Sequence, residues 1–343
     1  MKRGTRKRFD ELMAGLEPRL RRAFAESVDD IKSAAQKRLL EEAIAAGDIE
    51  RVLRVLQLGP EFFRPLDDAM REAFIAGGVF QLQETPPIPA PNGAGDLVIR
   101  FNGRTPRAEA FAEGASRFVV EIVEDQRDVI RATVRDGIAE GRNPRATARQ
   151  LVGQVNRATG RRTGGVVGLD STKAAWVRNM DAELRDPDLM ANYFTRERRD
   201  RRFDSIVRAA MDEGRPLSDI DRLRITGRYS DRLLALRGET IARTETLQAL
   251  NAGRVEGIEQ IIERGNISRD QAKMRWSATM DSRTRDSHES LNGQTVTVGQ
   301  PFVTSGGARL RYPGDTSLGA PASEVISCRC YAEPVIDFLA EFR

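Results

Sequence analysis

The chain has 343 residues, enough for two or three domains, and 40% of them are hydrophobic but only 6% aromatic. Charged residues make up 31% and the net charge is +4. Two cysteines cannot form a disulfide framework, and no apolar run approaches the roughly 20 residues of a membrane span. The apolar surface must come from aliphatic side chains, which favours helices over β-sandwiches. The basic N-terminus lacks the apolar centre of a secretion signal, so we expect a cytoplasmic product.

Residues 1–82 are predicted to form an N-terminal helical region. Apolar residues recur there at helical spacing, and Gly47 and Gly59 interrupt the pattern, so we expect several short helices. Pro60 and Pro65 suit first turns. The stretch 83–97 is rich in proline and glycine, which disfavour helix and sheet alike, and it is predicted to be a linker and a domain boundary.

Residues 98–266 are predicted to form a helical middle domain that opens with a short strand. Thr105, followed by a proline, suits the N-cap of a long helix that stops at Gly141. Asn143, also followed by a proline, begins the next helix in the same way. The glycine-rich stretch GRRTGGVVG lacks the Gly-Lys-Ser/Thr of a P-loop, so we interpret it as a flexible turn.

The second half of this middle domain contains the clearest helical pattern in the chain. Ser218 and Asp221 form a predicted capping box. Leu, Ile and Val residues then share one face over 238–265, and Gly265 with Asn266 marks the end of that helix.

Arginines are concentrated in the segment around 196–208. Only six of the 55 basic residues in the chain are lysines, a bias that suits phosphate binding but also follows from a GC-rich genome. One interpretation of the segment is a solvent face of salt bridges, and the other is a surface that contacts DNA or a protein partner. The candidate contact residues are Arg196, Arg198, Arg199, Arg201 and Arg202.

Residues 267–343 are predicted to form a compact α+β module. A short helix capped by Ser268 and Gln271 is expected to end near Trp276. Alternating apolar and polar residues between Asn-Gly, Gly-Gly and Pro-Gly turns then predict small antiparallel strands. The fold class is therefore mainly α, with an elongated helical body and this small C-terminal module.

The only histidine and both cysteines of the chain lie in this module. Cys328, Cys330 and His288 could bind one metal ion, zinc among the candidates, with Asp281 or Asp286 as a fourth ligand. The alternative is a pair of inward-facing cysteines on a strand, with a histidine that is hydrogen-bonded for structural reasons.

No catalytic residue set is recognisable in the sequence. It contains no Gly-x-Ser-x-Gly, no His-Glu-x-x-His and no dinucleotide fingerprint. We therefore predict that the protein is not an enzyme, and a metal-dependent enzyme using the His/Cys/Cys cluster is the alternative hypothesis.

The C-terminal run WSATMDSRTRDSHESLNGQTVTVGQPFVTSGGARLRYPGD, followed by EVISCRC, resembles the phage Mu protein F-like family of head morphogenesis, or minor capsid, proteins. The preceding ARTETLQALNAGR also resembles that family, and a looser likeness extends over about 98–334. The resemblance implies a virion component near the portal vertex, without a proven catalytic activity. It also suggests that Arg243 and Glu245 form an ion pair tying the long helix to the C-terminal module.

The resemblance further implies where the protein acts and what it contacts. The expected partners are the phage portal protein, a scaffold or major capsid protein and phage DNA, and no membrane is expected. The expected location is the phage head, reached from the host cytoplasm during assembly. The leading function is therefore procapsid assembly with DNA packaging or delivery, and a non-specific DNA-binding virion protein is a further alternative.

Overall fold

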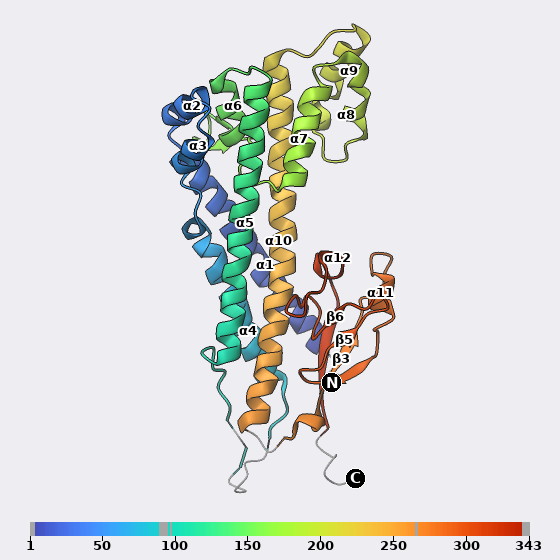
Figure 1. Ribbon diagram of the computed structural model, residues 1–343. Helices are drawn as coiled ribbons and strands as arrows, with labels where there is room; N and C mark the ends of the chain where they lie inside the picture. Colours follow the sequence, from blue (N-terminus) through green and yellow to red (C-terminus); the bar gives the residue numbers. More distant parts are fainter. Residues whose placement is uncertain (1–3, 89–94, 97, 265–266, 338–343) are drawn as a thin grey trace. The chain divides into compact units, whose positions relative to one another are not determined.

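The computed structural model describes residues 4–88, 95–96, 98–264 and 267–337 (Figure 1). Residues 89–94 and 97 of the predicted 83–97 linker, and the predicted helix end at Gly265 and Asn266, lie outside the described residues. The chain forms two compact units, each built from segments that are distant in sequence. Unit 1 combines Met1–Arg22, Leu66–Arg117 and Thr240–Arg343, and unit 2 combines Ala23–Pro65 and Phe118–Glu239.

The mainly helical fold class with a small C-terminal α+β module is confirmed. None of the helices within the described ranges combines the length and the apolar run needed to cross a lipid bilayer. The larger helices are α1 (Thr5–Ala34), α2 (Lys37–Ala45), α3 (Ile49–Leu56), α4 (Arg64–Glu84), α5 (Pro106–Ala139), α6 (Pro144–Val152), α7 (Ser171–Glu183), α8 (Ala191–Thr195), α9 (Asp204–Asp212) and α10 (Asp219–Arg264).

Local capping signals begin several of these helices where the sequence predicts. The Thr105 hydroxyl accepts a hydrogen bond from the Ala108 N–H at the start of α5, and the Asn143 side chain accepts one from the Arg145 N–H at the start of α6. The 3₁₀ turn η1 (Pro60–Phe63) begins with its proline. Asn143 and Thr105 satisfy backbone donors that have no partner within the helix.

The lengths of two helices differ from the prediction. α1 has 30 residues and continues through Pro18, so the N-terminal region is not made only of short helices. α10 has 46 residues and begins directly after its Ser218 cap, where the sequence predicts a helix over 238–265 only. Before residue 238 the helix buries polar side chains, such as Arg222 beside Asp181 of α7 and Arg237 beside Asp125 of α5, so an apolar pattern does not reveal it there.

The glycine-rich stretch is a fixed part of unit 2, which corrects its interpretation as a flexible turn. The Lys32 Nζ donates to the Gly164 carbonyl at 2.9 Å, and the Gly164 N–H donates to the Asp231 carboxylate at 2.6 Å. A Cβ on Gly164 would lie 2.9 Å from the Cα of Gly227. The glycines therefore allow two backbones to approach, which no sequence pattern distinguishes from loop flexibility.

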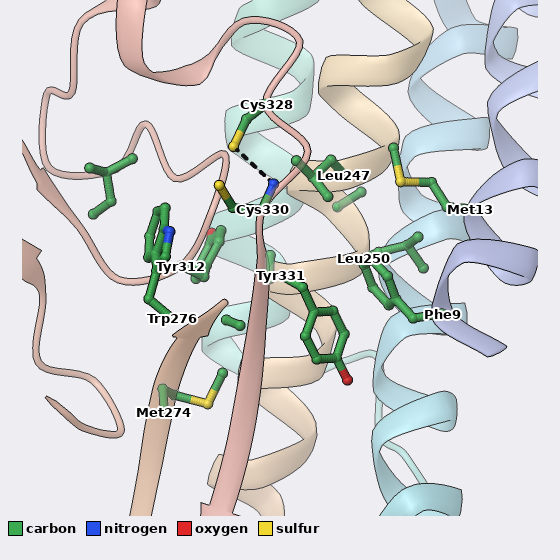
Figure 2. Packing of buried hydrophobic residues seen from close by; sticks show 14 of the residues in the cluster. Phe9, Met13, Leu247, Leu250, Met274, Trp276, Tyr312, Cys328, Cys330 and Tyr331 are labelled. Atoms are coloured by element: carbon green, nitrogen blue, oxygen red, sulfur yellow. Dashed lines mark hydrogen bonds between the residues drawn. The ribbon is translucent and has the colours of Figure 1, made fainter. Parts of the chain in front are cut away.

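The core of unit 1 joins α1, α4, α10 and the C-terminal module. Phe9 and Met13 of α1 and Leu247 and Leu250 of α10 are buried in one hydrophobic cluster with the strand residue Trp276 (Figure 2). α4 and α10 cross at glycines. A Cβ on Gly77 would lie 2.2 Å from the Leu250 carbonyl oxygen, and one on Gly253 would lie 1.8 Å from the Phe74 carbonyl oxygen.

Replacing Gly253 by alanine is expected to destabilise unit 1 by about 1–3 kcal/mol, because the added methyl group forces two helix backbones apart. Gly15→Ala is the matched control, since its Cβ meets no atom within 4 Å on α1. That variant should be neutral or stabilised by about 0.5–1 kcal/mol through helix propensity. Urea unfolding measures both, and equal destabilisation of the two variants would contradict the close helix crossing.

The C-terminal module contains a three-stranded antiparallel sheet in the order β4-β3-β7. These strands are β3 (Ala272–Ser277), β4 (Thr295–Thr297) and β7 (Tyr331–Ile336). Between β4 and β7 in the chain, β5 (Phe302–Val303) and β6 (Arg309–Leu310) pair with each other. The predicted capping box of Ser268 and Gln271 is present on the 3₁₀ turn η4 (Arg269–Gln271).

Two short elements differ from the prediction, one in this module and one at the start of the predicted middle domain. The capped turn ends at Gln271, and Trp276 lies on strand β3 rather than at a helix end. The stretch DLVIRFNG, residues 96–103, is expected to contain a short strand, and its residues 98–103 form none. In both places short alternating patterns were ambiguous, because tertiary pairing decides which of them form ladders.

Candidate metal site in the C-terminal module

The structure brings the only histidine and both cysteines together. His288 lies on the short helix α11 (Asp286–Glu289). The two cysteines, which are labelled in Figure 2, lie between α12 (Ala322–Val325) and β7. Cys328 and Cys330 therefore precede the strand, so the interpretation of both as residues of one strand is wrong. Each Sγ lies 3.5 Å from the same atom, His288 Nδ1.

The three side chains form a compact, buried set of potential ligand atoms. These atoms all lie within 4.8 Å of one another, and His288 and Cys328 are each only 1% exposed. Zinc bonds of about 2.3 Å to sulfur and 2.0–2.1 Å to nitrogen place two ligand atoms of a tetrahedral ion about 3.6 Å apart. The observed 3.5 Å distances suit a shared ion, and they also suit weak S–H···N hydrogen bonds.

The surroundings of the cluster resemble the outer shell of a metal site. Glu324 Oε2 lies 3.0 Å from His288 Nε2, at ion-pair distance but without the alignment of a hydrogen bond. The Ser287 hydroxyl donates to the same Glu324 oxygen at 2.8 Å. A carboxylate on the far nitrogen of a metal-binding histidine orients the ring and raises its basicity, so Glu324 is suited to that role.

The two thiols hold unequal affinities for protons. The pKa of the Cys328 thiol is held well below its usual range, mainly by a hydrogen bond from the Cys330 side chain. Burial raises this pKa, and the hydrogen bond with His288 lowers it further. The same hydrogen bond and burial raise the pKa of the Cys330 thiol. The Cys330 N–H also donates to Cys328 Sγ at 3.4 Å, so Cys328 is the sulfur that most readily carries negative charge.

The aspartates considered as a fourth ligand lie elsewhere. Both oxygens of Asp281 accept hydrogen bonds from the Arg329 guanidinium, which holds the pKa of that carboxyl below its usual range. Asp286 is exposed on α11. Within the described ranges no carboxylate completes the His288/Cys328/Cys330 group, and Asp281 instead anchors the arginine between the two cysteines.

A Cys-His-carboxylate arrangement is also found at nucleophilic active sites. Here both sulfurs contact one ring nitrogen, and Cys328 is buried beneath the core residues that surround it. A nucleophile needs access for its substrate, which Cys328, only 1% exposed, does not provide. The geometry therefore favours a structural role over a catalytic one.

The five candidate contact arginines have different environments in unit 2. Arg196 makes a two-pronged ion pair with Glu183, and Arg199 pairs with Asp204 in the same way. Arg202 binds Asp200. Among the described residues, two arginines of the five make no ion pair and are exposed, namely Arg198 and Arg201.

The residues around the Arg-Thr-Glu triplet connect α10 to two other segments of unit 1. Arg243 Nη1 lies 3.8 Å from Glu17 of α1, and the Thr244 hydroxyl accepts a hydrogen bond from the Ser327 N–H at 3.0 Å. Residues two apart on a helix do not face each other, and the pairing of Arg243 with Glu245 stays a prediction. Thr244, rather than a charge, provides the observed hydrogen bond to the cysteine-containing segment.

Sequence reasoning missed Arg254, the central buried polar residue of unit 1. Its guanidinium donates to the Ala332 carbonyl at 2.7 Å and to the Tyr331 hydroxyl at 3.0 Å, and it lies over the rings of Phe9, Phe80 and Tyr331. Burial lowers its pKa. Within ARTETLQALNAGR this arginine interrupts the apolar face of the helix, and that interruption could have indicated a buried polar residue.

Comparison with known proteins finds a family likeness over this region. The model of the Phage Mu protein F like protein family matches residues 202–333. Minor head protein GP7 of Bacillus phage SPP1 is 34% identical over 96 residues, which are 28% of this chain and 29% of that protein.

A second relative carries a different name. The NAD(+)--arginine ADP-ribosyltransferase EFV of Enterococcus faecalis is 36% identical over 98 residues, 28% of this chain and 18% of that protein. The chain thus spans less than a third of the length of either relative. No solved structure matches the chain. Residues 202–333 therefore carry a likeness to the phage Mu protein F-like family.

Proposed function

We propose that this chain is a minor head protein of a tailed phage and acts in head morphogenesis. The observation that carries the proposal is the family match over residues 202–333, together with the likeness to a phage minor head protein. The matched region includes the whole His288/Cys328/Cys330 cluster and all of α10. The function would therefore reside in the C-terminal module and the helix that supports it, which together would bind partners. The protein would be located in the virion, which assembles in the host cytoplasm.

The finer proposal concerns partners. It places the protein at the portal vertex, in contact with the portal protein and with a scaffold or major capsid protein, during procapsid assembly and DNA packaging or delivery. Support comes from the family that the region resembles and from the long α10, which supplies residues to both units. Long helices offer extended surfaces on which a partner helix can pack.

The role proposed for the cysteine and histidine cluster is structural. His288, Cys328 and Cys330 would hold one zinc ion that joins α11 to the segment before β7, with Glu324 orienting the histidine. A module with such short strands has a small core of its own, so a metal clip would add stability. The proposal is non-enzymatic, and the stretch shared with the ADP-ribosyltransferase covers too little of that protein to transfer its activity.

The experiment is to delete the gene from the phage or prophage that encodes it and to analyse the particles by mass spectrometry and electron microscopy. We expect the chain in wild-type heads at low copy number, fewer infectious particles without it, and rescue by the gene in trans. A tagged copy should also co-purify the portal protein from infected cells. Its absence from wild-type particles, with unchanged yield after deletion, would refute the proposal.

A further inference from the structure

Unit 2 contains a pocket where four of its helices meet the glycine-rich stretch. Residues of α5, α6, α7 and α10 line the pocket together with residues 163–166, and every lining residue belongs to unit 2. Protein atoms leave about 540 Å³ free there, part of which is open to solvent. Pockets that hold small molecules are typically about 300–1,000 Å³, so the space is large enough for a ligand.

Hydrogen bonds and close backbone contacts hold the walls of this pocket in place. The Val166 N–H donates to the Gln150 carbonyl at 2.8 Å, which attaches the glycine-rich stretch to α6. A Cβ on Gly165 would lie 2.4 Å from the backbone nitrogen of Gly153. The Ser230 hydroxyl of α10 donates to the Gly165 carbonyl. The pocket is therefore preorganised, and a ligand would lose little affinity to rearrangement of its walls.

The charged residues that line the pocket leave one positive charge without a partner. They are Arg149, Arg178 and Asp181. Asp181 is only 7% exposed and accepts hydrogen bonds from two other arginines, at 2.6 and 2.8 Å. Arg178 lies 3.4 Å from the Asp136 carboxylate. Arg149 is half-buried and makes no ion pair within the described part of the chain, so the free charge of the pocket is a guanidinium.

The uncharged lining residues favour a ligand that accepts hydrogen bonds and has a compact apolar part. The Thr133 and Thr226 hydroxyls each donate to a carbonyl group of their own helix at 2.8 Å, so these donors are already used. Val166, Val177 and Leu223 supply apolar surface. An arginine fork makes its strongest hydrogen bonds to carboxylates and phosphates.

We propose that this pocket binds a small organic anion. Its carboxylate or phosphate group would pair with Arg149, and its compact apolar group would pack on Val177 and Leu223. Small-molecule sites commonly combine apolar walls with a few well-placed polar groups in this way. The inference goes beyond the proposed function, because the lining residues outside α10 all precede residue 202, where the family likeness begins.

Titration of the full-length protein with phenyl phosphate and with benzoate, measured by calorimetry, tests the proposal. Benzyl alcohol lacks the charge and inorganic phosphate lacks the apolar group, so these two compounds separate the two contributions. We expect at least one of the organic anions to bind at one site per chain, about tenfold or more tightly than either comparison compound. That anion should also raise the melting temperature, because it binds the folded chain.

Three variants locate the bound anion. Arg149→Met removes the charge but keeps an unbranched side chain, and it should weaken binding about tenfold or more. Arg145→Met is the matched control, because Arg145 is exposed one turn earlier on α6 and makes no ion pair within the described ranges. Leu223→Trp should fill the pocket and abolish binding. Circular dichroism checks that each variant is folded.

Failure of both organic anions to bind would overturn the proposal, as would equally tight binding of benzyl alcohol or inorganic phosphate. An equal loss of affinity in Arg145→Met would contradict the assignment to Arg149. Unchanged affinity in both Arg149→Met and Leu223→Trp would place the anion outside this pocket. Because binding is measured on purified protein, none of these results changes the outcome of the particle analysis.

Discussion

Purified protein is expected to contain about one zinc ion per chain, and removal of that ion is expected to lower the melting temperature of unit 1 sharply. Structural zinc in small modules contributes apparent free energies of about 10–16 kcal/mol at neutral pH, and a set of three protein ligands should still provide several kcal/mol. Elemental analysis with thermal melting before and after chelation is the measurement. Lower pH should release the ion, because thiols and imidazole must lose protons to bind it.

Two variants distinguish a zinc ligand from a residue that only orients one. Cys330→Ser should abolish stoichiometric zinc and destabilise the module. Glu324→Gln should keep the fold but weaken zinc affinity about 10–100-fold, since it removes the carboxylate beside the His288 ring and leaves an amide oxygen that can still accept from Ser287. Ser323→Ala, an exposed change on the same short helix as Glu324, is the control. A metal-free protein with a melting curve indifferent to chelator would mean that the thiols pack as buried apolar groups hydrogen-bonded to His288.

Replacing Arg254 by alanine is expected to be the most destabilising single change in α10, by about 3–5 kcal/mol. The substitution empties a fully buried site between α1, α4 and β7. It removes the contacts of the guanidinium with the rings of Phe9, Phe80 and Tyr331. It also leaves the Ala332 carbonyl without its donor.

Arg254→Met separates packing from charge. Methionine fills much of the space without requiring a buried cation. The Arg254→Met variant should therefore lose only about 1–3 kcal/mol of stability, because the polar partners of Arg254 are left without a donor. Arg264→Ala, an exposed change in the last turn of the same helix, should stay within about 0.5 kcal/mol of the parent. Urea unfolding followed by tryptophan fluorescence measures all three, and an alanine variant as stable as the control would contradict the central role of Arg254.

The composition and short-range patterns of the sequence determined the helical class, the caps at Thr105 and Asn143 and the small β-containing C-terminal module. These features follow from interactions between residues a few positions apart, which a sequence displays directly. The concentration of His288, Cys328 and Cys330 at one end of the chain also pointed to a cluster, because few other residues there could bind a soft metal.

The tertiary structure alone decided how these parts combine. It placed Glu324 beside His288, directed Asp281 to Arg329, and seated Arg254 among three aromatic rings. Each of these contacts depends on where segments dozens of residues apart pack, and a side chain's type restricts its partner without selecting it. The gathering of Arg228 and Arg232 around Asp200 has the same origin, since only the packing of α10 against the segment before the 3₁₀ turn η3 (Arg201–Phe203) brings those charges to one carboxylate.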